Sequence, residues 1–379
     1  MPKVSIALPT YNRADTIVRA IKSVQAQTFQ DWELIVVDDG STDGTSELIA
    51  GMDSRMVLIR QENRGFTEAR NAAIRAGTGD YFAFIDSDDE FMPHHLELCV
   101  AFLETFKDES FVSTELLEDF GGGVVVNHYR TETSDWYPKK AALVGSHALD
   151  LPPGETDDYL RIYESKEPIG AWGRHVIERL APAQEAFLYR GEIFDFLRYD
   201  FLITITATVM RSSVFEEVGL PEPRWLTGSD FHYLARLCRK YRANFMGIPT
   251  FIKHEFNADG ELPAFGHVVT GKSALRFASE WQAAWDDLFW NSRSHDAELR
   301  GLRSLRLFWT ATAALRVGLR KDTLDNLKQV REGLPKFWEG NALYWAVRCL
   351  PGVRLPQRAY AGVSRVRRIY ERARRVLRA

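Results

Sequence analysis

Cysteine is scarce in this chain of 379 residues, and its three cysteines, Cys99, Cys238 and Cys349, lie far apart. An odd number of widely spaced cysteines fits neither a disulfide framework nor a zinc cluster. We therefore expect a reducing compartment, the cytoplasm. The sequence has no run of about 18 apolar residues, so no membrane-spanning helix is expected. The start of the chain lacks a charged segment followed by an apolar one, so no signal peptide is expected.

Positive charge is not in excess, because the chain has 48 lysines and arginines but 52 acidic residues, which gives a net charge of −4. This balance argues against a dedicated nucleic-acid-binding protein. The charge is unevenly spread, however. Residues 341–379 hold ten arginines and one acidic residue, Glu371. The function of this basic tail therefore has to be considered separately from that of the rest of the chain.

Apolar residues recur at helical spacing in the basic tail, between its arginines, at Val363, Val366, Ile369, Tyr370, Ala373 and Leu377. A basic amphipathic helix suits an anionic membrane surface, which predicts peripheral contact with the inner face of the plasma membrane. The alternatives are a helix that packs on the acidic remainder of the chain or on a second subunit in a homodimer, and a disordered tail.

Strand and helix patterns alternate over the first 90 residues. They predict strands at 4–8, 33–37, 57–60 and 81–85, and helices over about 17–24, 46–51 and 67–76. Asn12 is expected to cap the first helix. This alternation predicts an α/β fold with a parallel sheet and right-handed crossovers. Ligands of such sheets bind beyond the carboxyl ends of the strands.

Polar clusters follow three of these strands, at Thr10 to Arg13, Asp38 to Ser41 and Asp86 to Asp89. Within the last cluster, Asp86 and Asp88 place two carboxylates one residue apart at a strand end. Such a pair suits a hard cation, Mg²⁺ or Mn²⁺, that also binds phosphate oxygens and neutralises a diphosphate leaving group. The alternative is a solvated acidic turn or a helix N-cap, but the position after the fourth strand favours the cation.

Two further residues of this region have open interpretations. Asp39 can accept the imide N–H of a uracil or thymine ring, or a ribose hydroxyl, or it can simply belong to an Asp-Gly turn that caps the next helix. Arg70, on the helix after Gly65, could contact the base or phosphate of a nucleotide, or could be a solvated helix arginine.

The pattern is looser beyond residue 115. Residues 115–200 are rich in aromatic residues, which can stack on sugar rings, so this insert is expected to shape an acceptor site. Plain core packing is the alternative for most of them. A strand is predicted over 201–210, a helix over 231–241 and a last strand over 244–252, with a chain that is largely helical from about residue 271.

Taken together, these elements resemble family 2 glycosyltransferases of the GT-A fold. The matching stretches are V-S-I-A-L-P-T-Y-N-R (4–13), Q-T-F-Q-D-W-E-L-I-V-V-D-D-G-S-T-D-G-T (27–45), N-R-G-F-T-E-A-R-N-A-A-I-R-A-G-T-G-D-Y-F-A-F-I-D-S-D-D (63–89) and T-A-T-V-M-R-S-S-V-F-E-E-V-G (206–219). The resemblance implies a Rossmann-like, mostly parallel central sheet flanked by helices. It is thin over the insert and absent from the C-terminal helices.

The resemblance also implies how the chain is divided and which residues bind the donor. A catalytic domain over 1–265 would comprise a nucleotide-sugar-binding half, 1–114, and an acceptor-side half, 115–265, followed by a helical region over 266–379. Asp39 would hold the nucleobase, and Asp86 would touch the ribose or the metal. The expected donor-binding residues are Pro9, Thr10, Tyr11, Arg13, Asp39, Arg70, Asp86 and Ser87.

The remaining implied roles are a metal site and a base. Asp88 would ligate Mn²⁺ or Mg²⁺, and His254 would approach the metal or the diphosphate, unless it is a surface histidine. Members of this family generally invert the anomeric centre, a single displacement that needs one base. That base is expected to be Asp230, in a segment that resembles the family's G-E-D with Ser229 at the Glu position. The alternative for Asp230 is a helix N-cap.

The expected activity is therefore transfer of a sugar, from a UDP-sugar in preference to other donors, to an acceptor hydroxyl on a glycan or a lipid-linked molecule, in surface polysaccharide or glycoconjugate synthesis. A nicotinamide dehydrogenase is rejected because the turn over 9–13 has no glycine. A sugar nucleotidyltransferase normally has a glycine- and lysine-rich first loop, which is also missing. A non-catalytic sugar-nucleotide-binding relative is the remaining alternative, and Asp88 and Asp230 argue against it.

Overall fold

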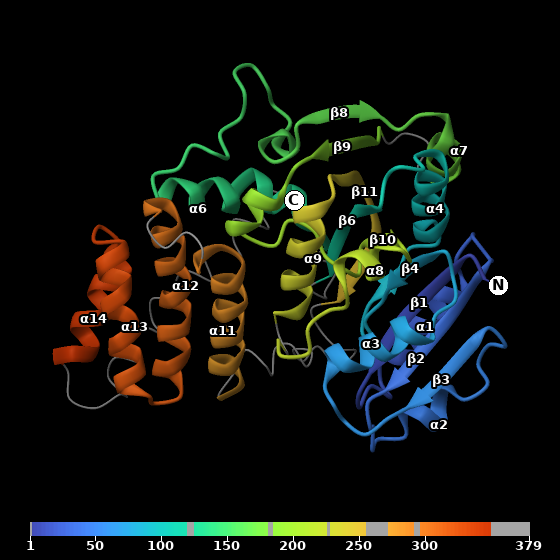
Figure 1. Ribbon diagram of the computed structural model, residues 1–379, viewed down its shortest axis with the longest axis horizontal. Coiled ribbons are helices and arrows are strands. Elements are labelled where there is room, and N and C mark those ends of the chain that lie inside the picture. Colours follow the sequence, from blue (N-terminus) through green and yellow to red (C-terminus); the bar gives the residue numbers. More distant parts are fainter. Residues whose placement is uncertain are drawn as a thin grey trace. The chain divides into compact units, whose positions relative to one another are not determined.

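In a computed structural model of the chain, four apolar segments near the start form neighbouring parallel strands, as predicted (Figure 1). β1 (Val4–Thr10) pairs with β2 (Trp32–Asp38) on one side and with β4 (Tyr81–Phe84) on the other, and β3 (Met56–Arg60) pairs with β2. The helices between them are α1 (Ile17–Gln25), α2 (Thr45–Ile49) and α3 (Phe66–Ala76). Because the strands are parallel, their carboxyl ends lie at one edge of the sheet.

The structure describes residues 2–119, 125–180, 185–225, 228–254, 272–291 and 296–349. They fall into two compact units. The first comprises residues 1–138 and 148–263, and the second comprises 139–147 and 264–379. None of the helices in the described part of the chain combines the length and the apolar character needed to cross a bilayer.

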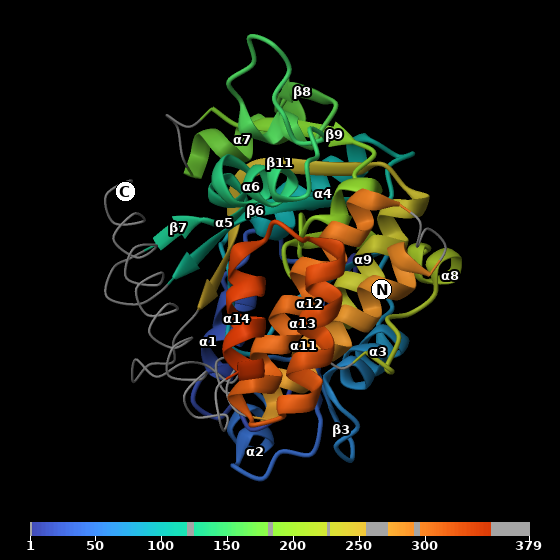
Figure 2. The same ribbon diagram turned by 90° about the vertical axis from the view of Figure 1, so that its left-hand side faces the viewer.

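The sheet of the first unit continues beyond β4 with mixed pairing. Its strand order is β3-β2-β1-β4-β10-β6-β11-β9-β8, and β10 runs antiparallel to both of its neighbours, whereas β11 runs parallel to β6. Figure 2 shows β7 beside β6. These later strands are β5 (Glu90–Phe91), β6 (Phe111–Asp119), β7 (Val125–Asn127), β8 (Ser165–Pro168), β9 (Phe187–Gly191), β10 (Thr208–Arg211) and β11 (Ala243–His254). The central sheet flanked by helices agrees with the predicted GT-A architecture.

The later helices of the chain before residue 255 are α4 (His95–Thr105), α5 (His128–Thr131), α6 (Tyr137–Leu143), α7 (Ala171–Leu180), α8 (Val214–Val218) and α9 (Ser229–Lys240). Helix α9 matters most for the site, because its first turn carries Asp230. Its apolar face, with Phe231, Leu234 and Leu237, is buried, which fixes the rotation of the helix and so the direction in which Asp230 points.

Two local predictions are wrong. Asn12 does not cap α1, because its φ is 50° and its side-chain Oδ1 instead accepts the N–H of Thr42 at 2.8 Å. The strand predicted over 201–210 is confined to its last residues, Thr208–Arg211. Before it, the hydroxyl of Thr204 accepts the N–H of Ala207, which closes a turn in place of a sheet ladder.

A buried carboxylate joins the segment after β6 to the sheet. Glu115 in β6 is 1% exposed, and its Oε1 accepts the N–H groups of Leu116 and Tyr129 at 2.8 and 3.0 Å. Its Oε2 accepts the N–H of Arg130 at 2.9 Å and the hydroxyl of Tyr159 at 2.6 Å. Burial raises the pKa of Glu115, and these four donors oppose the increase. One side chain therefore organises three segments.

Replacing Glu115 with alanine should lower the free energy of unfolding by about 3 kcal/mol or more, because four donors, three of them in buried hydrogen bonds, lose their acceptor. Glu115→Gln should cost less, since its amide oxygen can still serve two of the donors, while its NH₂ group faces the N–H of Arg130. Urea unfolding followed by circular dichroism measures both variants. The exposed Glu62→Gln serves as the matched control. A cost for Glu115→Ala no larger than that of the control would contradict this account.

The second unit takes in the end of α6, from residue 139 on, and its described part also contains α11 (Lys272–Trp285), α12 (Ala297–Arg316), α13 (Arg320–Gly333) and α14 (Trp338–Cys349). The last three enclose a core of Ala311, Leu315, Leu327, Leu343, Tyr344 and Val347. Asp296 caps α12 by accepting the N–H groups of Glu298 and Leu299. The C-terminal helices are therefore present as predicted, whereas the amphipathic tail over 363–377 lies outside the described residues.

Candidate active site

The loops that follow β1 and β2 are hydrogen-bonded to each other. The N–H of Asn12 donates to Ser41 Oγ at 2.9 Å, and the N–H of Arg13 donates to Thr45 Oγ1 at 3.0 Å. Pro9 and Thr10 are buried at the end of β1, whereas Tyr11 is 46% exposed. The structure thus brings the predicted residues 9–13 to the carboxyl edge of the sheet and presents Tyr11 to solvent.

Asp39, just beyond β2, fastens the loop before α3. Its Oδ1 accepts Gln61 Nε2 at 2.8 Å and the N–H of Arg64 at 2.9 Å, and its Oδ2 accepts the N–H of Gly65 at 2.8 Å. Gly40 lets the two loops approach, because a Cβ there would lie 3.1 Å from the backbone nitrogen of Asn63. A nucleobase at Asp39 would share these oxygens with the loop, and the nucleobase role stays a prediction.

Asp86 to Asp89 form a tight turn after β4, closed by a hydrogen bond from the N–H of Asp89 to the carbonyl of Asp86 at 3.1 Å. The side chains of Asp86 and Asp88 are 34% and 25% exposed, whereas Ser87 and Asp89 are buried. Arg13 Nε lies 3.7 Å from Asp88 Oδ2. The turn and the β1 loop therefore meet at one place, as the parallel sheet predicts.

Negative charge is concentrated in this turn. Burial raises the pKa of Asp88, the neighbouring charge of Asp86 raises it further, and Arg13 and Lys253 oppose the increase. The pKa of Asp89 is raised well above its ordinary value, first by burial and then by Asp88 and Asp86. A bound cation would offset this repulsion, so the oxygen ligands of the turn fit Mg²⁺ or Mn²⁺.

Across the described ranges no three His, Cys, Asp or Glu side chains gather into a metal-binding group. A cation at Asp88 would therefore take its other ligands from diphosphate oxygens and water, as Mg²⁺ commonly does. The carboxylates of the turn supply the protein part of such a site.

His254, the last residue of β11, already has a carboxylate at each ring nitrogen. Nε2 lies 2.7 Å from Glu90 Oε1 and Nδ1 lies 3.3 Å from Asp119 Oδ2, while its N–H donates to Asp89 Oδ1 at 3.0 Å. Its side chain is 13% exposed, so the surface-histidine alternative is wrong. Metal ligation by His254 stays a prediction that requires one of these carboxylates to give way.

Arg70 on α3 connects the turn after β4 to α9. Its Nη2 lies 2.9 Å from Asp86 Oδ1, and its Nη1 forms an ion pair with Asp230 Oδ1. The arginine side chain is 1% exposed, so the solvated-arginine alternative is wrong. Asp230 does not cap α9, because the helix begins at Ser229 with Gly228 in the capping position. The N-cap alternative for Asp230 is therefore also wrong.

The side chain of Asp230 is a quarter exposed at this junction. Burial raises the pKa of Asp230, Arg70 opposes the increase through its charge, and Asp86 adds to it. A carboxylate with a raised pKa that remains partly accessible suits a general base.

Sequence reasoning missed two contacts at this site. Arg19 on α1 donates to the carbonyl of Asp88 at 2.5 Å and lies 3.4 Å from Glu90, which fastens the turn from the helix side. Gln61 supports Asp39 from the end of β3. No local motif marks either residue, because each contact joins positions more than 20 apart in the chain. Only the packed fold makes these contacts apparent.

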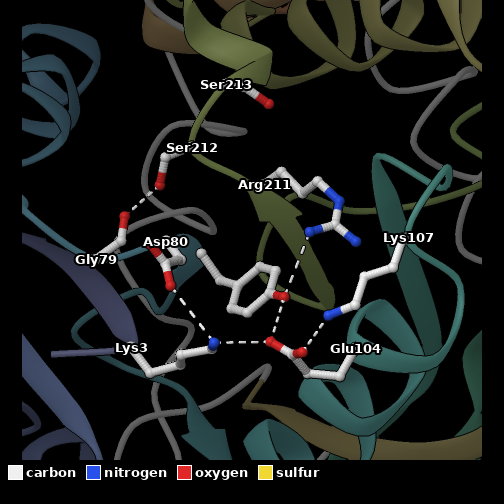
Figure 3. A pocket seen from close by; sticks show the side chains of 9 residues that line it. Lys3, Gly79, Asp80, Glu104, Lys107, Arg211, Ser212 and Ser213 are labelled. Carbon is white, nitrogen blue, oxygen red and sulfur yellow. Dashed lines mark hydrogen bonds and ion pairs between the residues drawn. The ribbon is translucent and has the colours of Figure 1, made fainter.

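A cavity of about 440 Å³ lies at the opposite, amino end of the same strands (Figure 3), lined by Lys3, Gly79, Asp80, Tyr81, Glu104, Lys107, Arg211, Ser212 and Ser213. Its charges satisfy one another. Lys107 and Lys3 hydrogen-bond to Glu104 and lower the pKa of that carboxyl to about 2. Arg211 donates to the carbonyl groups at the end of α4. The charged residues that line the cavity are therefore better explained as stabilising this edge of the sheet than as forming a reaction site.

Comparison with known proteins agrees with this geometry. Residues 5–150 match the family model "Glycosyl transferase family 2". The chain is 38% identical over 197 residues to the putative glycosyltransferase EpsH of Bacillus subtilis, covering 51% of this chain and 52% of EpsH. It is 41% identical over 106 residues to the putative teichuronic acid biosynthesis glycosyltransferase TuaG of the same organism, covering 27% and 42%.

The matched segments span between 15% and 52% of the curated relatives, about half their length or less. Among solved structures, residues 1–349 of S. aureus TarS in complex with UDP align with a TM-score of 0.50 and 14% identity, covering 94% of this chain and 88% of that one. The same TarS fragment in complex with UDP-GlcNAc aligns with a TM-score of 0.51 and 14% identity, covering 95% of this chain and 92% of that one. At this identity the likeness concerns the fold. Residues 5–150 therefore match glycosyltransferase family 2, and the chain has the GT-A fold.

Proposed function

We propose that this protein transfers a sugar from a nucleoside-diphosphate sugar, with UDP as the favoured nucleotide, to a hydroxyl group of an acceptor. The observation that carries the proposal is the pair of contacts made by Arg70. Its guanidinium group binds Asp86 with one terminal nitrogen and Asp230 with the other, so the two carboxylates lie on either side of it. The carboxylate proposed to bind the donor, Asp86, therefore lies near the carboxylate proposed to act on the acceptor hydroxyl, Asp230. Similarity to proteins solved with UDP and UDP-GlcNAc supports the donor class.

In the proposed reaction, Asp39 and residues 9–13 bind the nucleoside, and Asp86 and Ser87 bind the ribose and diphosphate side. Asp88 holds a divalent cation, which supplies positive charge to the diphosphate when it is bound. Asp230 accepts the proton of the acceptor hydroxyl while the hydroxyl oxygen bonds to C1 of the sugar. The bond from C1 to the diphosphate breaks in the same displacement, so the anomeric configuration inverts.

The acceptor is proposed to be a glycan or a lipid-linked molecule of surface polysaccharide or glycoconjugate synthesis. The similarity to TuaG, whose name refers to teichuronic acid biosynthesis, supports this class of pathway. Peripheral membrane contact of the basic tail would suit a lipid-linked acceptor, and ten arginines between residues 341 and 379 support that contact.

A panel of nucleotide sugars, tested by thermal shift with Mn²⁺, examines the proposal directly. A UDP-sugar at about 100 times its Kd should stabilise the folded protein by about 2.7 kcal/mol, and we expect a rise in Tm of about 5 °C. The same panel is then assayed for release of the nucleoside diphosphate. Stabilisation without any release, with or without acceptor extracts, would instead identify a non-catalytic binder of sugar nucleotides.

A further inference from the structure

Arg70 is a cation buried between two carboxylates. Its guanidinium group lies 4.1 Å from the centre of the Phe66 ring and 5.7 Å from that of Phe84, so the aromatic rings hold its position. One terminal nitrogen binds Asp86 and the other binds Asp230. A buried arginine in such a setting has little freedom to move, and it fixes the carboxylates that it binds.

The rest of α3 strengthens the connection to α9. Thr67 Oγ1 donates to Ser229 Oγ at 3.0 Å, and Ser229 Oγ lies 3.5 Å from Asp230 Oδ1. One turn later, Asn71 Nδ2 donates to the carbonyl of Pro221 at 2.8 Å. Three residues on one face of α3 therefore hold the segment that ends at Asp230.

The charged groups that face Asp230 come from two elements. Arg70 comes from α3 and Asp86 from the turn after β4, and Ser229 is the neighbour from α9 itself. Within the described residues, the hydrogen bonds to Asp230 reach only Oδ1. The side chain is a quarter exposed, so we assign the substrate hydroxyl to the second oxygen, Oδ2, while Oδ1 stays anchored.

We infer that Arg70 is a positioning residue that anchors Asp230 through Oδ1, keeps it ionised and fixes it relative to the donor-side carboxylate Asp86. This inference rests on the proposed function, in which Asp230 is the base. It differs from the expectation that Arg70 binds the donor, because the arginine acts on the reaction through Asp230. Only a planar group with two terminal nitrogens can hold both carboxylates at this spacing, so lysine cannot replace it.

Arg70→Met and Arg70→Lys test the inference, with Arg75→Met on the same helix as the matched control, since Arg75 is exposed and lies 3.7 Å from Glu68. We expect kcat of Arg70→Met to fall about 100-fold or more, the loss typical of a misplaced catalytic group. Donor Kd should stay within about threefold, a change of under 1 kcal/mol. The acid limb of the rate profile should move to higher pH. Arg70→Lys should restore only part of kcat. An unchanged kcat, or a weakened donor Kd at full kcat, would overturn the inference.

Thermal unfolding provides a measurement that does not depend on activity. Arg70→Met leaves the Asp230 carboxylate without its cation, whereas Asp230→Asn removes the negative charge first. The loss of Tm caused by Arg70→Met should therefore be smaller in the Asp230→Asn background than in the native chain. Equal losses in both backgrounds would show that the pair is uncoupled and would refute the inference. If the native chain transfers no sugar, the proposed function fails, yet this cycle still decides whether Arg70 anchors Asp230.

Discussion

Asp230→Asn should lower the rate of sugar transfer at least about 100-fold, the lower end of what a general base contributes. The amide cannot take the proton of the acceptor hydroxyl. It keeps the volume of the carboxylate, and its oxygen can still accept a hydrogen bond from Arg70, so donor affinity should change little. Single-turnover transfer and calorimetric donor binding measure the two effects separately.

The exposed Asp31→Asn is the control for this substitution, and it should transfer sugar at the native rate. The native enzyme adds a second observable, because burial raises the pKa of Asp230 and the base must be ionised to act. The rate should therefore fall as the pH drops through that pKa, which lies above the ordinary value for an aspartate. Native turnover by Asp230→Asn would remove this residue from the role of base.

Asp88→Ala should abolish the effect of metal on donor binding. With Mn²⁺ present, the donor affinity should fall about 10- to 100-fold, because a cation that has lost its carboxylate ligand no longer holds the diphosphate. Calorimetry with Mn²⁺ and with EDTA should then give the same Kd. The variant should remain folded, because Asp88 stands in an acidic turn where burial and Asp86 raise its pKa, so its removal relieves repulsion.

Asp80→Ala is the control, since Asp80 precedes β4 at its amino end, and its side chain is 71% exposed and 3.4 Å from Lys3. It should bind the donor with the native dependence on Mn²⁺. If Asp88→Ala also kept that dependence, the cation would have to bind elsewhere.

The strands of the first 90 residues could be predicted from the sequence, because each is a short apolar run that ends in polar residues. Their parallel arrangement then places residues 10–13 beside the turn at Asp88, a contact that the structure confirms. The periodicity of α3 was also sufficient to place Arg70 on a helix, whereas the helix predicted over 231–241 begins two residues late and leaves Asp230 just before it. Local pattern and global fold agree in this part of the chain.

The contacts between these helices could not be predicted. Arg70 and Asp230 are 160 residues apart, and nothing local indicates that a helix arginine is buried between two carboxylates. The strand predicted over 201–210 is wrong for a related reason. Its β-branched residues have strand propensity, but the Thr204 hydroxyl competes for the backbone and closes a turn. The burial of Arg70 depends on tertiary contacts, and the loss of the strand depends on a side chain that hydrogen-bonds to the backbone.

The four hydrogen bonds at Glu115 have a consequence for how the insert can vary. The backbone at Tyr129 and Arg130 and the hydroxyl of Tyr159 are tied to a single point on β6. The chain between residues 131 and 158 is therefore held at both ends. It begins with a π-helical turn over 132–136 and with α6, and its mostly exposed stretch over 150–156 has no helix or strand. Because loop-closure costs rise only slowly with length, residues can be added or removed within 150–156 without moving the two held ends. Since the insert is predicted to shape the acceptor site, changes of length in this stretch offer a way to test acceptor preference while β1 to β4 stay unchanged.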